Sequence, residues 1–395
     1  MFENTIGLDP VTEQLKTALR DGTLPQAVLL HGPRFSGKGT VALEIARALT
    51  CRQKAAWNCS CRSCTLHRTL SHPDIVLAGP RYFDLEIAAA TRAWETEPRT
   101  GTLYLLIRAI RKLVRRFDPF LWPEVKLRKI LPLVEGVEEV LQEVEPAVGM
   151  EDLPTGLNKL VRPVSRLVAA VPHEIVPVDL VRNLSSWAQV SSTGPAKVVL
   201  FEEVHTLQDS ARNSMLKILE EPPSGVWFVL TTTRRGAVMP TLLSRLRSYG
   251  FPLRTPQQQQ EVISKIFRST LATESTLDQY FRQLPGDHSQ QWTDVAAAIL
   301  ETSADSSAEH LLAVLATLRS RIGNGNSRTN AEFLLQEIAL QLREPLGRVR
   351  GAGLEDLRCR GEAVRLCQGR ITQRNMNPLG VLSDLVLSFR EGLAQ

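Results

Sequence analysis

The hydrophobic and polar positions of the chain change their period several times, and these changes predict alternating strands and helices. Short apolar runs at 27–30, 197–201 and 227–230 have the length and composition of buried strands. Apolar residues spaced three and four apart at 41–50 and 210–219 follow the helical period. Strands that alternate with helices predict an α/β fold with a mostly parallel sheet and right-handed connections.

The remaining pattern is helical. Amphipathic segments at 81–172 predict a helical insertion between core elements of the first domain, and after Pro252 the pattern predicts only helices. We therefore expect an α/β domain at 1–250, a small helical domain at 251–300 and a second helical domain at 301–395.

Composition and charge narrow the class of protein. The formal net charge is +5 and 43% of the residues are hydrophobic, which is ordinary for a globular protein. The longest apolar runs are well short of the roughly 20 residues that a membrane helix needs. The first residues also lack the basic and apolar regions of a signal peptide. We expect a cytoplasmic protein without membrane contact. The mild positive charge allows contact with nucleic acid but does not indicate it.

A glycine-rich loop, HGPRFSGKGT at 31–40, joins the first predicted strand to the first helix. In this context backbone N–H groups and a helix N-terminus face phosphates, and the lysine reaches the outer ones. The Ser or Thr that usually holds Mg²⁺ is replaced by Gly39, with Thr40 one place late. We predict nucleotide binding and leave hydrolysis, and with it ATP and Mg²⁺ as cofactors, open. The predicted binding residues are Gly32, Gly37, Lys38, Gly39 and Thr40.

Two acidic residues, Glu202 and Glu203, follow the strand predicted at 197–201. Carboxylates at the carboxyl end of a strand, in a sheet that also feeds a phosphate loop, hold Mg²⁺ and position the attacking water. We predict that role for both, against the alternative of a solvated strand end. The metal-side residue is usually Asp, and the longer Glu202 changes or removes direct coordination.

Four of the six cysteines lie close together, at Cys51, Cys59, Cys61 and Cys64. In a reducing compartment, four thiolates at this spacing predict a structural zinc site rather than disulfides or catalysis. The single-residue gap before Cys61 is unusual, so His67 and His72 are alternative ligands. The other interpretation is that the four thiols bind no metal.

Basic residues at 108–116 are interleaved with apolar ones along a predicted helix at 102–117. Two interpretations remain open, contact with DNA phosphates and a solvated basic face over a small apolar contact.

Three segments resemble the bacterial DNA polymerase III clamp-loader family of AAA+ proteins, in particular its delta-prime and gamma/tau subunits. They are KVVLFEEVH at 197–205, NSMLKILEEPP at 213–223 and LLSRL at 242–246. The start at 6–9 and the end at 375–385 are also similar to that family, whereas 81–172 has no counterpart in it.

The resemblance implies roles for further residues. Arg245 matches the arginine finger that acts in trans on a neighbour's ATP, and Thr232 matches a polar sensor near the γ-phosphate. Ser289 stands where a second sensor arginine is expected. The family also has a zinc module at the position of 51–64. Residues 251–300 and 301–395 would then be its lid and its collar or oligomerisation domain.

The implied function is a delta-prime type subunit of a hetero-pentameric clamp loader, which places the sliding clamp on primed DNA in an ATP-driven step. Its own ATPase activity would be weak or absent, because Gly39, Glu202 and Ser289 all depart from the catalytic pattern. One alternative is an active gamma-type ATPase of the same complex. A remote alternative is a stand-alone nucleotide kinase, in which phosphate loops also end in GKGT.

Overall fold

The computed structural model describes residues 1–81, 83–123, 127–145, 157–170, 176–269, 276–282, 284, 289–303, 306–322, 327–343, 350–372 and 376–391. The chain divides into two compact units, Met1–Leu284 and Pro285–Gln395. Each unit has hydrophobic core residues of its own. No helix in these ranges is both long and apolar enough to span a membrane.

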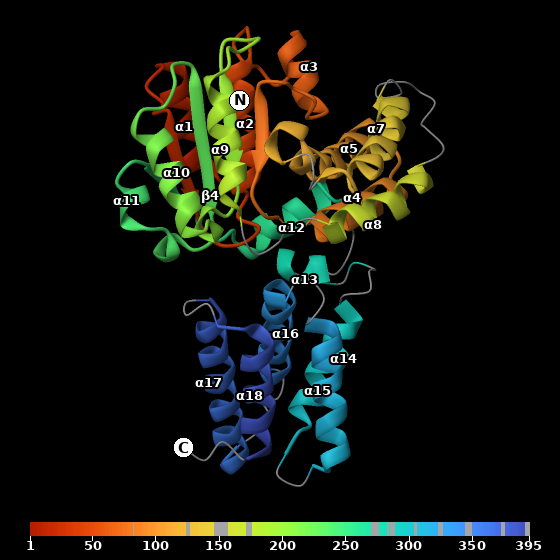
Figure 1. Ribbon diagram of the computed structural model, residues 1–395. Coiled ribbons are helices and arrows are strands. Elements are labelled where there is room, and N and C mark those ends of the chain that lie inside the picture. Colours follow the sequence, from red (N-terminus) through yellow and green to blue (C-terminus); the bar gives the residue numbers. More distant parts are fainter. Residues whose placement is uncertain are drawn as a thin grey trace. The chain divides into compact units, whose positions relative to one another are not determined.

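The first unit alternates strands and helices through most of its length (Figure 1). Its strands are β1 (Ala27–His31), β2 (Ile75–Ala78), β3 (Lys197–Phe201), β4 (Val226–Thr232) and β5 (Arg247–Gly250). Its α-helices are α1 (Asp9–Arg20), α2 (Lys38–Thr50), α3 (Arg62–Arg68), α4 (Phe83–Thr96), α5 (Thr100–Val114), α7 (Leu131–Val144), α8 (Val161–Ala170), α9 (Val178–Gln189), α10 (Asp209–Glu220), α11 (Pro240–Leu243), α12 (Pro256–Lys265) and α13 (Leu277–Arg282). Short 3₁₀ helices are η1 (Arg115–Phe117), η2 (Pro119–Leu121), η4 (Leu157–Leu160), η5 (Val204–Thr206) and η6 (Arg235–Ala237).

The five strands form one parallel sheet in the order β2-β3-β4-β1-β5. Side chains alternate between its two faces. Leu29 and Phe228 pack in one core with residues of α9 and α10, and Val28 and Val229 pack in another with residues of α1 and α2. Helices therefore cover both faces, as the α/β prediction requires. This topology is consistent with the AAA+ fold.

The sheet order places the ends of β1, β3 and β4 next to one another. Across β1 and β4, His31 lies opposite Thr232, and across β3 and β4, Phe201 lies opposite Leu230. Because parallel strands end at the same edge, the loop after β1 and the acidic residues after β3 come together there. The fold thus assembles the predicted nucleotide site from distant segments.

The region predicted as an insertion contains α4, α5, α7 and α8, which share a core of their own. Leu103, Ile107, Val137, Leu141 and Leu167 are fully buried in it. The predicted helix at 102–117 ends at Val114 and continues as the 3₁₀ helix η1.

The second unit is helical in its described residues, with α14 (Ser289–Leu300), α15 (Ala308–Ile322), α16 (Ser327–Arg343), α17 (Ala352–Thr372) and α18 (Pro378–Arg390). Its core includes Leu318, Leu334, Ile338, Leu382 and Phe389, each almost completely buried. Ser289, the predicted second sensor position, is the first residue of α14. Its side chain lies outside the part of the chain that the structure describes.

Candidate nucleotide site and metal centre

The glycine-rich loop connects β1 to α2, and two of its glycines are required by its shape. Gly37 is the N-cap of α2 with φ 90°, in the left-handed region. A Cβ on Gly32 would collide with the backbone carbonyl of Phe251. Arg254, almost buried, fixes the loop by donating to the carbonyls of Ile6 at 2.8 Å and Phe35 at 2.5 Å.

Lys38 lies at the start of α2 and is 6% exposed. Its Nζ donates to the carbonyl oxygens of Gly32 at 2.8 Å and Pro33 at 2.6 Å, both in the loop itself. Burial lowers the pKa of Lys38 to about 8, while the carboxylates of Glu203 and Glu202 act in the opposite direction. The lysine is therefore positioned within the loop, where an anionic phosphate would favour its charged form. Thr40, one residue past Gly39, is exposed.

Glu202 is held by two arginines, one on each carboxylate oxygen. Arg81 Nη1 donates to Oε1, and Arg116 Nη2 donates to Oε2. A Cβ on Gly39 would lie 2.9 Å from Arg81 Nη1 and 3.3 Å from Glu202 Oε1. A Cβ on Gly79 would collide with the backbone carbonyl of Glu202. The two glycines thus make room for a close arrangement of charged groups.

Arg81 connects Glu202 to a second carboxylate, that of Glu86. Arg81 Nε donates to Glu86 Oε2 at 2.6 Å, and Lys112 Nζ donates to the other oxygen of Glu86. Burial lowers the pKa of Lys112 to about 8 and that of Arg116 to about 10, although the neighbouring carboxylates oppose the shift. These five groups, which we call the Arg81 network, are Arg81, Glu86, Lys112, Arg116 and Glu202.

The basic residues at 108–116 face the inside of the first unit, so both sequence interpretations of them are wrong. They bind carbonyls and carboxylates of the core and of the insertion, and side chains of Arg111 and Arg116 are only 5% exposed. The contacts are Arg108 with the carbonyl of His67, Arg111 with Glu138 and Glu145, Lys112 with Glu86, Arg115 with the carbonyl of Ile75, and Arg116 with Glu202. Spacing along one helix could not reveal partners that lie on other elements.

Glu203 and Thr232 are connected through His205. Glu203 Oε2 accepts hydrogen bonds from the backbone N–H of Thr233 at 3.0 Å and from its hydroxyl at 2.7 Å, and lies 3.3 Å from His205 Nδ1. The same ring nitrogen is 2.9 Å from Thr232 Oγ1. Thr232 is fully buried, and its carbonyl accepts from the N–H of Gly32 at 3.2 Å. The predicted base and sensor therefore lie beside the loop.

Arg245 is engaged away from this cluster. It follows α11, and its guanidinium contacts Glu220 Oε1 at 2.5 Å and the carbonyl of Thr241 at 2.7 Å. The side chain keeps 32% of its surface exposed. The guanidinium is thus accessible but oriented by the last residue of α10.

The four predicted cysteine ligands come together between α2 and α3. Their Sγ atoms all lie within 4.8 Å of one another, with 3.7 Å between Cys51 and Cys59 and 3.8 Å between Cys51 and Cys61. Zn–S bonds of about 2.3 Å in a tetrahedron place sulfurs about 3.8 Å apart, so the cluster fits a metal such as zinc. Cys51 would bind from the end of α2, and Cys61 and Cys64 from the start of α3.

The two histidines proposed as substitute ligands are engaged elsewhere. His67 Nε2 is 2.8 Å from the carbonyl of Leu43, and His72 Nε2 is 3.0 Å from Ser63 Oγ. Next to the thiols, Arg47 donates to Cys64 Sγ at 3.7 Å and pairs with Glu44 at 2.9 Å. A buried guanidinium beside the thiols favours their negatively charged form.

Sequence reasoning missed Arg81 and Arg254 of this region, and it considered Arg116 only as one of the basic residues at 108–116. Each acts on a segment far away in the chain, so neither motif nor period indicates its role. The one available signal was Gly39, since a missing side chain beside a metal position leaves space that another group can take.

Comparison with known proteins places most of the first unit in one family. The model of the family described as DNA polymerase III, delta subunit, matches residues 7–118 and 164–254, together just over half of the chain. Arg81, Glu202 and Arg245 all lie within the matched residues. The match also includes 81–118 and 164–172, so the expectation that 81–172 has no counterpart in the family is wrong for these two segments.

Individual relatives match shorter stretches. A gamma/tau subunit of DNA polymerase III from Mycobacterium tuberculosis is 33% identical over 85 residues, which are 22% of this chain and 14% of that protein. A delta' subunit from Escherichia coli is 33% identical over 101 residues, 25% of this chain and 29% of that protein. The chain therefore spans less than a third of the length of either relative. A solved gamma subunit-related protein from Thermotoga maritima aligns over 97% of this chain and 99% of that chain. The sequence identity is 13% and the TM-score is 0.38, and this TM-score is too low to infer a shared fold.

Proposed function

Because the chain belongs to the DNA polymerase III delta subunit family, we propose that it is a delta-prime type subunit of the clamp loader. In this role it assembles with other clamp-loader subunits in a hetero-pentamer and helps to place the sliding clamp on primed DNA in the cytoplasm. The observation that carries the proposal is the family match, which includes the phosphate loop, the acidic strand end and Arg245.

Weak or absent ATP hydrolysis by the chain itself is part of the proposal. Residue 39 has no hydroxyl to hold Mg²⁺, and both oxygens of Glu202 are paired with arginines. The carboxylate of Glu203 likewise accepts two hydrogen bonds from Thr233. A site that turns over ATP needs a metal ligand and a carboxylate that positions water, and these contacts oppose both functions.

The active contribution that we propose is Arg245, acting on the ATP of a neighbouring subunit. Its guanidinium is partly exposed and is held by a single carboxylate, that of Glu220. A neighbour's γ-phosphate carries more negative charge than Glu220 and can bind the same planar fork in two places. The ion pair with Glu220 would then keep the finger oriented before assembly. Residues 251–300 and 301–395 would supply the lid and the collar through which the subunits join.

The test is ATP turnover by the assembled complex with clamp and primed DNA. We expect Arg245→Ala to lower turnover at the neighbouring site by about 10³-fold or more, the range measured for arginine fingers. Arg247→Ala is the matched control, since Arg247 is exposed two residues away. Full activity of the Arg245→Ala complex would contradict the finger role. Hydrolysis by the chain alone that Lys38→Ala abolishes would instead assign a gamma-type ATPase.

A further inference from the structure

The position that Mg²⁺ occupies beside a phosphate loop is defined here by two residues, Gly39 and Glu202. The first offers no oxygen, and the second has both carboxylate oxygens bound by guanidinium groups. A divalent cation would need to displace at least one of these arginines to reach an oxygen of Glu202, and residue 39 would add no oxygen. The residues present therefore do not fit magnesium.

What fills this position is the guanidinium of Arg81. Its Nη1 would lie 2.9 Å from a Cβ at residue 39 and bonds Oε1 of Glu202, so it stands between the two residues that would flank the metal. Its Nε bond to Glu86 fixes the plane of the group from the opposite side.

The charges of the Arg81 network favour an anion over a cation. Three basic groups and two carboxylates leave a net charge of +1 beside the loop, and the charges of Lys38 and Glu203 cancel each other. Magnesium would have to enter this positive region, whereas a phosphate would be attracted to it. A guanidinium also matches the geometry of phosphate oxygens with paired N–H donors.

We propose that Arg81 takes the place of the magnesium ion, so that the site binds a nucleoside di- or triphosphate without a divalent metal. The loop and Lys38 would hold the phosphates, and Arg81 would neutralise the oxygens that otherwise face the metal. The inference goes beyond the proposed function, and it takes from the sequence only the expectation that the glycine-rich loop binds nucleotide. Phosphoryl transfer is not part of it.

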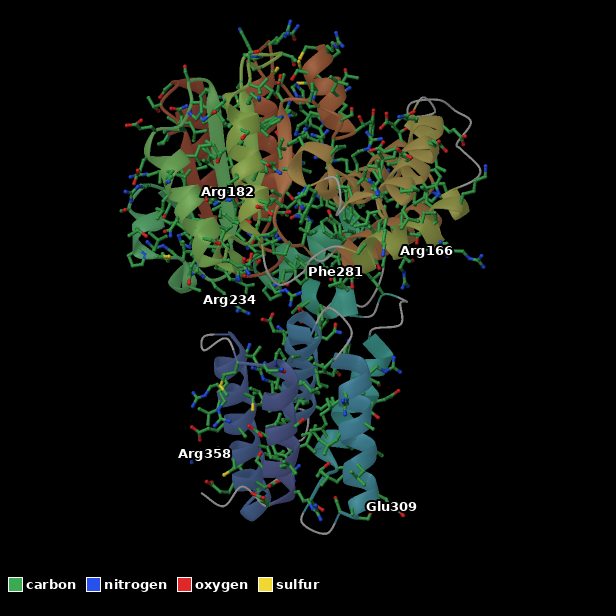
Figure 2. All side chains as sticks on the ribbon, viewed as in Figure 1. Arg166, Arg182, Arg234, Phe281, Glu309 and Arg358 are labelled. Atoms are coloured by element: carbon green, nitrogen blue, oxygen red, sulfur yellow. The ribbon has the colours of Figure 1, made fainter. Side chains whose placement is uncertain are left out.

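The experiment measures ATP binding to the full chain by isothermal titration calorimetry, once with excess Mg²⁺ and once with EDTA. We expect similar dissociation constants in the two media. Arg81→Ala should weaken binding in EDTA about tenfold or more, the usual effect of losing a charge-assisted hydrogen bond. Arg182→Ala, an exposed arginine on α9 that Figure 2 labels, should bind like the natural chain.

Three results would overturn the proposal: binding only with Mg²⁺, unchanged binding by a folded Arg81→Ala chain, or no binding in either medium. The comparison of the two media needs no substitution, so the proposal is tested even where Arg81→Ala does not fold. Failure here would leave the Arg245 role untouched, because that role is measured at a neighbour's site in the assembled complex.

Discussion

Glu86 lies among the buried charges beside the phosphate loop, and Arg81 and Lys112 both pair with it. Burial alone would raise the pKa of its carboxyl, but these two cations hold it at about 2. Removing one member of such a buried group leaves its partners without compensation, at a cost of about 3–5 kcal/mol. The pairing of Glu86 with Arg81 and Lys112 thus depends on the ionised form of its carboxyl.

This arrangement predicts how stability depends on pH. The pKa of Glu86 is lower in the folded chain than the usual 4.5, so its contribution is complete above pH 4.5 and is lost as the pH falls toward 2. The shift corresponds to roughly 3 kcal/mol. Urea unfolding should show a stability difference between the natural chain and Glu86→Gln that is large near about pH 7 and shrinks toward about pH 3.

A suitable control is Glu95→Gln, which changes an exposed carboxylate on the same helix, α4. It should give no comparable pH dependence. A difference for Glu86→Gln that stays constant across the acid range would contradict the ion-pair assignment.

Single residues were predictable where a strand end or a loop fixed them. Lys38, Glu202 and Thr232 lie beside the loop because strand and motif place them there. Their partners were not predictable, since Arg81 and Arg116 reach Glu202 only when the insertion packs against the sheet. Charge on a helix indicates that partners exist but does not identify them.

Among the elements, α2 joins the two sites of the first unit. Its first residue is Lys38 of the phosphate loop, and Cys51 caps its other end and contributes to the cluster of four thiols. The segment between Cys51 and α3 has little regular structure, so a bound metal would supply constraints that hydrogen bonds do not. We propose a structural role for zinc here, because four thiolates leave no open coordination position.

Zinc content tests the thiol cluster. The purified natural chain should carry about one zinc per chain, and Cys64→Ser should lose most of it, because three thiolates and water bind more weakly. Metal analysis after gel filtration measures the ratio, and limited proteolysis should show faster cleavage within 51–64 in the variant. Cys359→Ser, in the second unit, is the control that should retain the metal. Absence of zinc from the natural chain, or its retention in Cys64→Ser, would contradict the proposal.

Two strands were missed by sequence reasoning for reasons of length and exposure. β2 is four residues long, too short to show a period, although all four are buried. β5 has only Tyr249 buried among its four residues and lies at the sheet edge, so it lacks a strand composition altogether.

At the scale of the whole molecule, the two compact units have independent cores. Large side chains of α14 to α18 are buried with one another in the second unit, as those of the sheet and its helices are in the first. Core substitutions should therefore affect the unit that contains them more than the other.

Leu382→Ala tests this independence. Leu382 is fully buried in α18, and truncation should destabilise the second unit by about 2–5 kcal/mol. Hydrogen exchange read by mass spectrometry should show faster exchange over 289–391 and little change over the sheet. Leu354→Ala, which removes a side chain that is 44% exposed, should change exchange little. Equal acceleration in both units would show that they unfold as one.

The glycine at position 39 also constrains how this sequence can change over time. A hydroxyl residue there would meet Arg81, and replacing Arg81 alone would leave Glu202 still bound to Arg116 with no hydroxyl nearby. Each substitution is unfavourable on its own, so a metal-binding loop could arise from this sequence only through coupled substitutions at separated positions. A single substitution at residue 39 or at residue 81 is therefore not enough to give this loop a magnesium site.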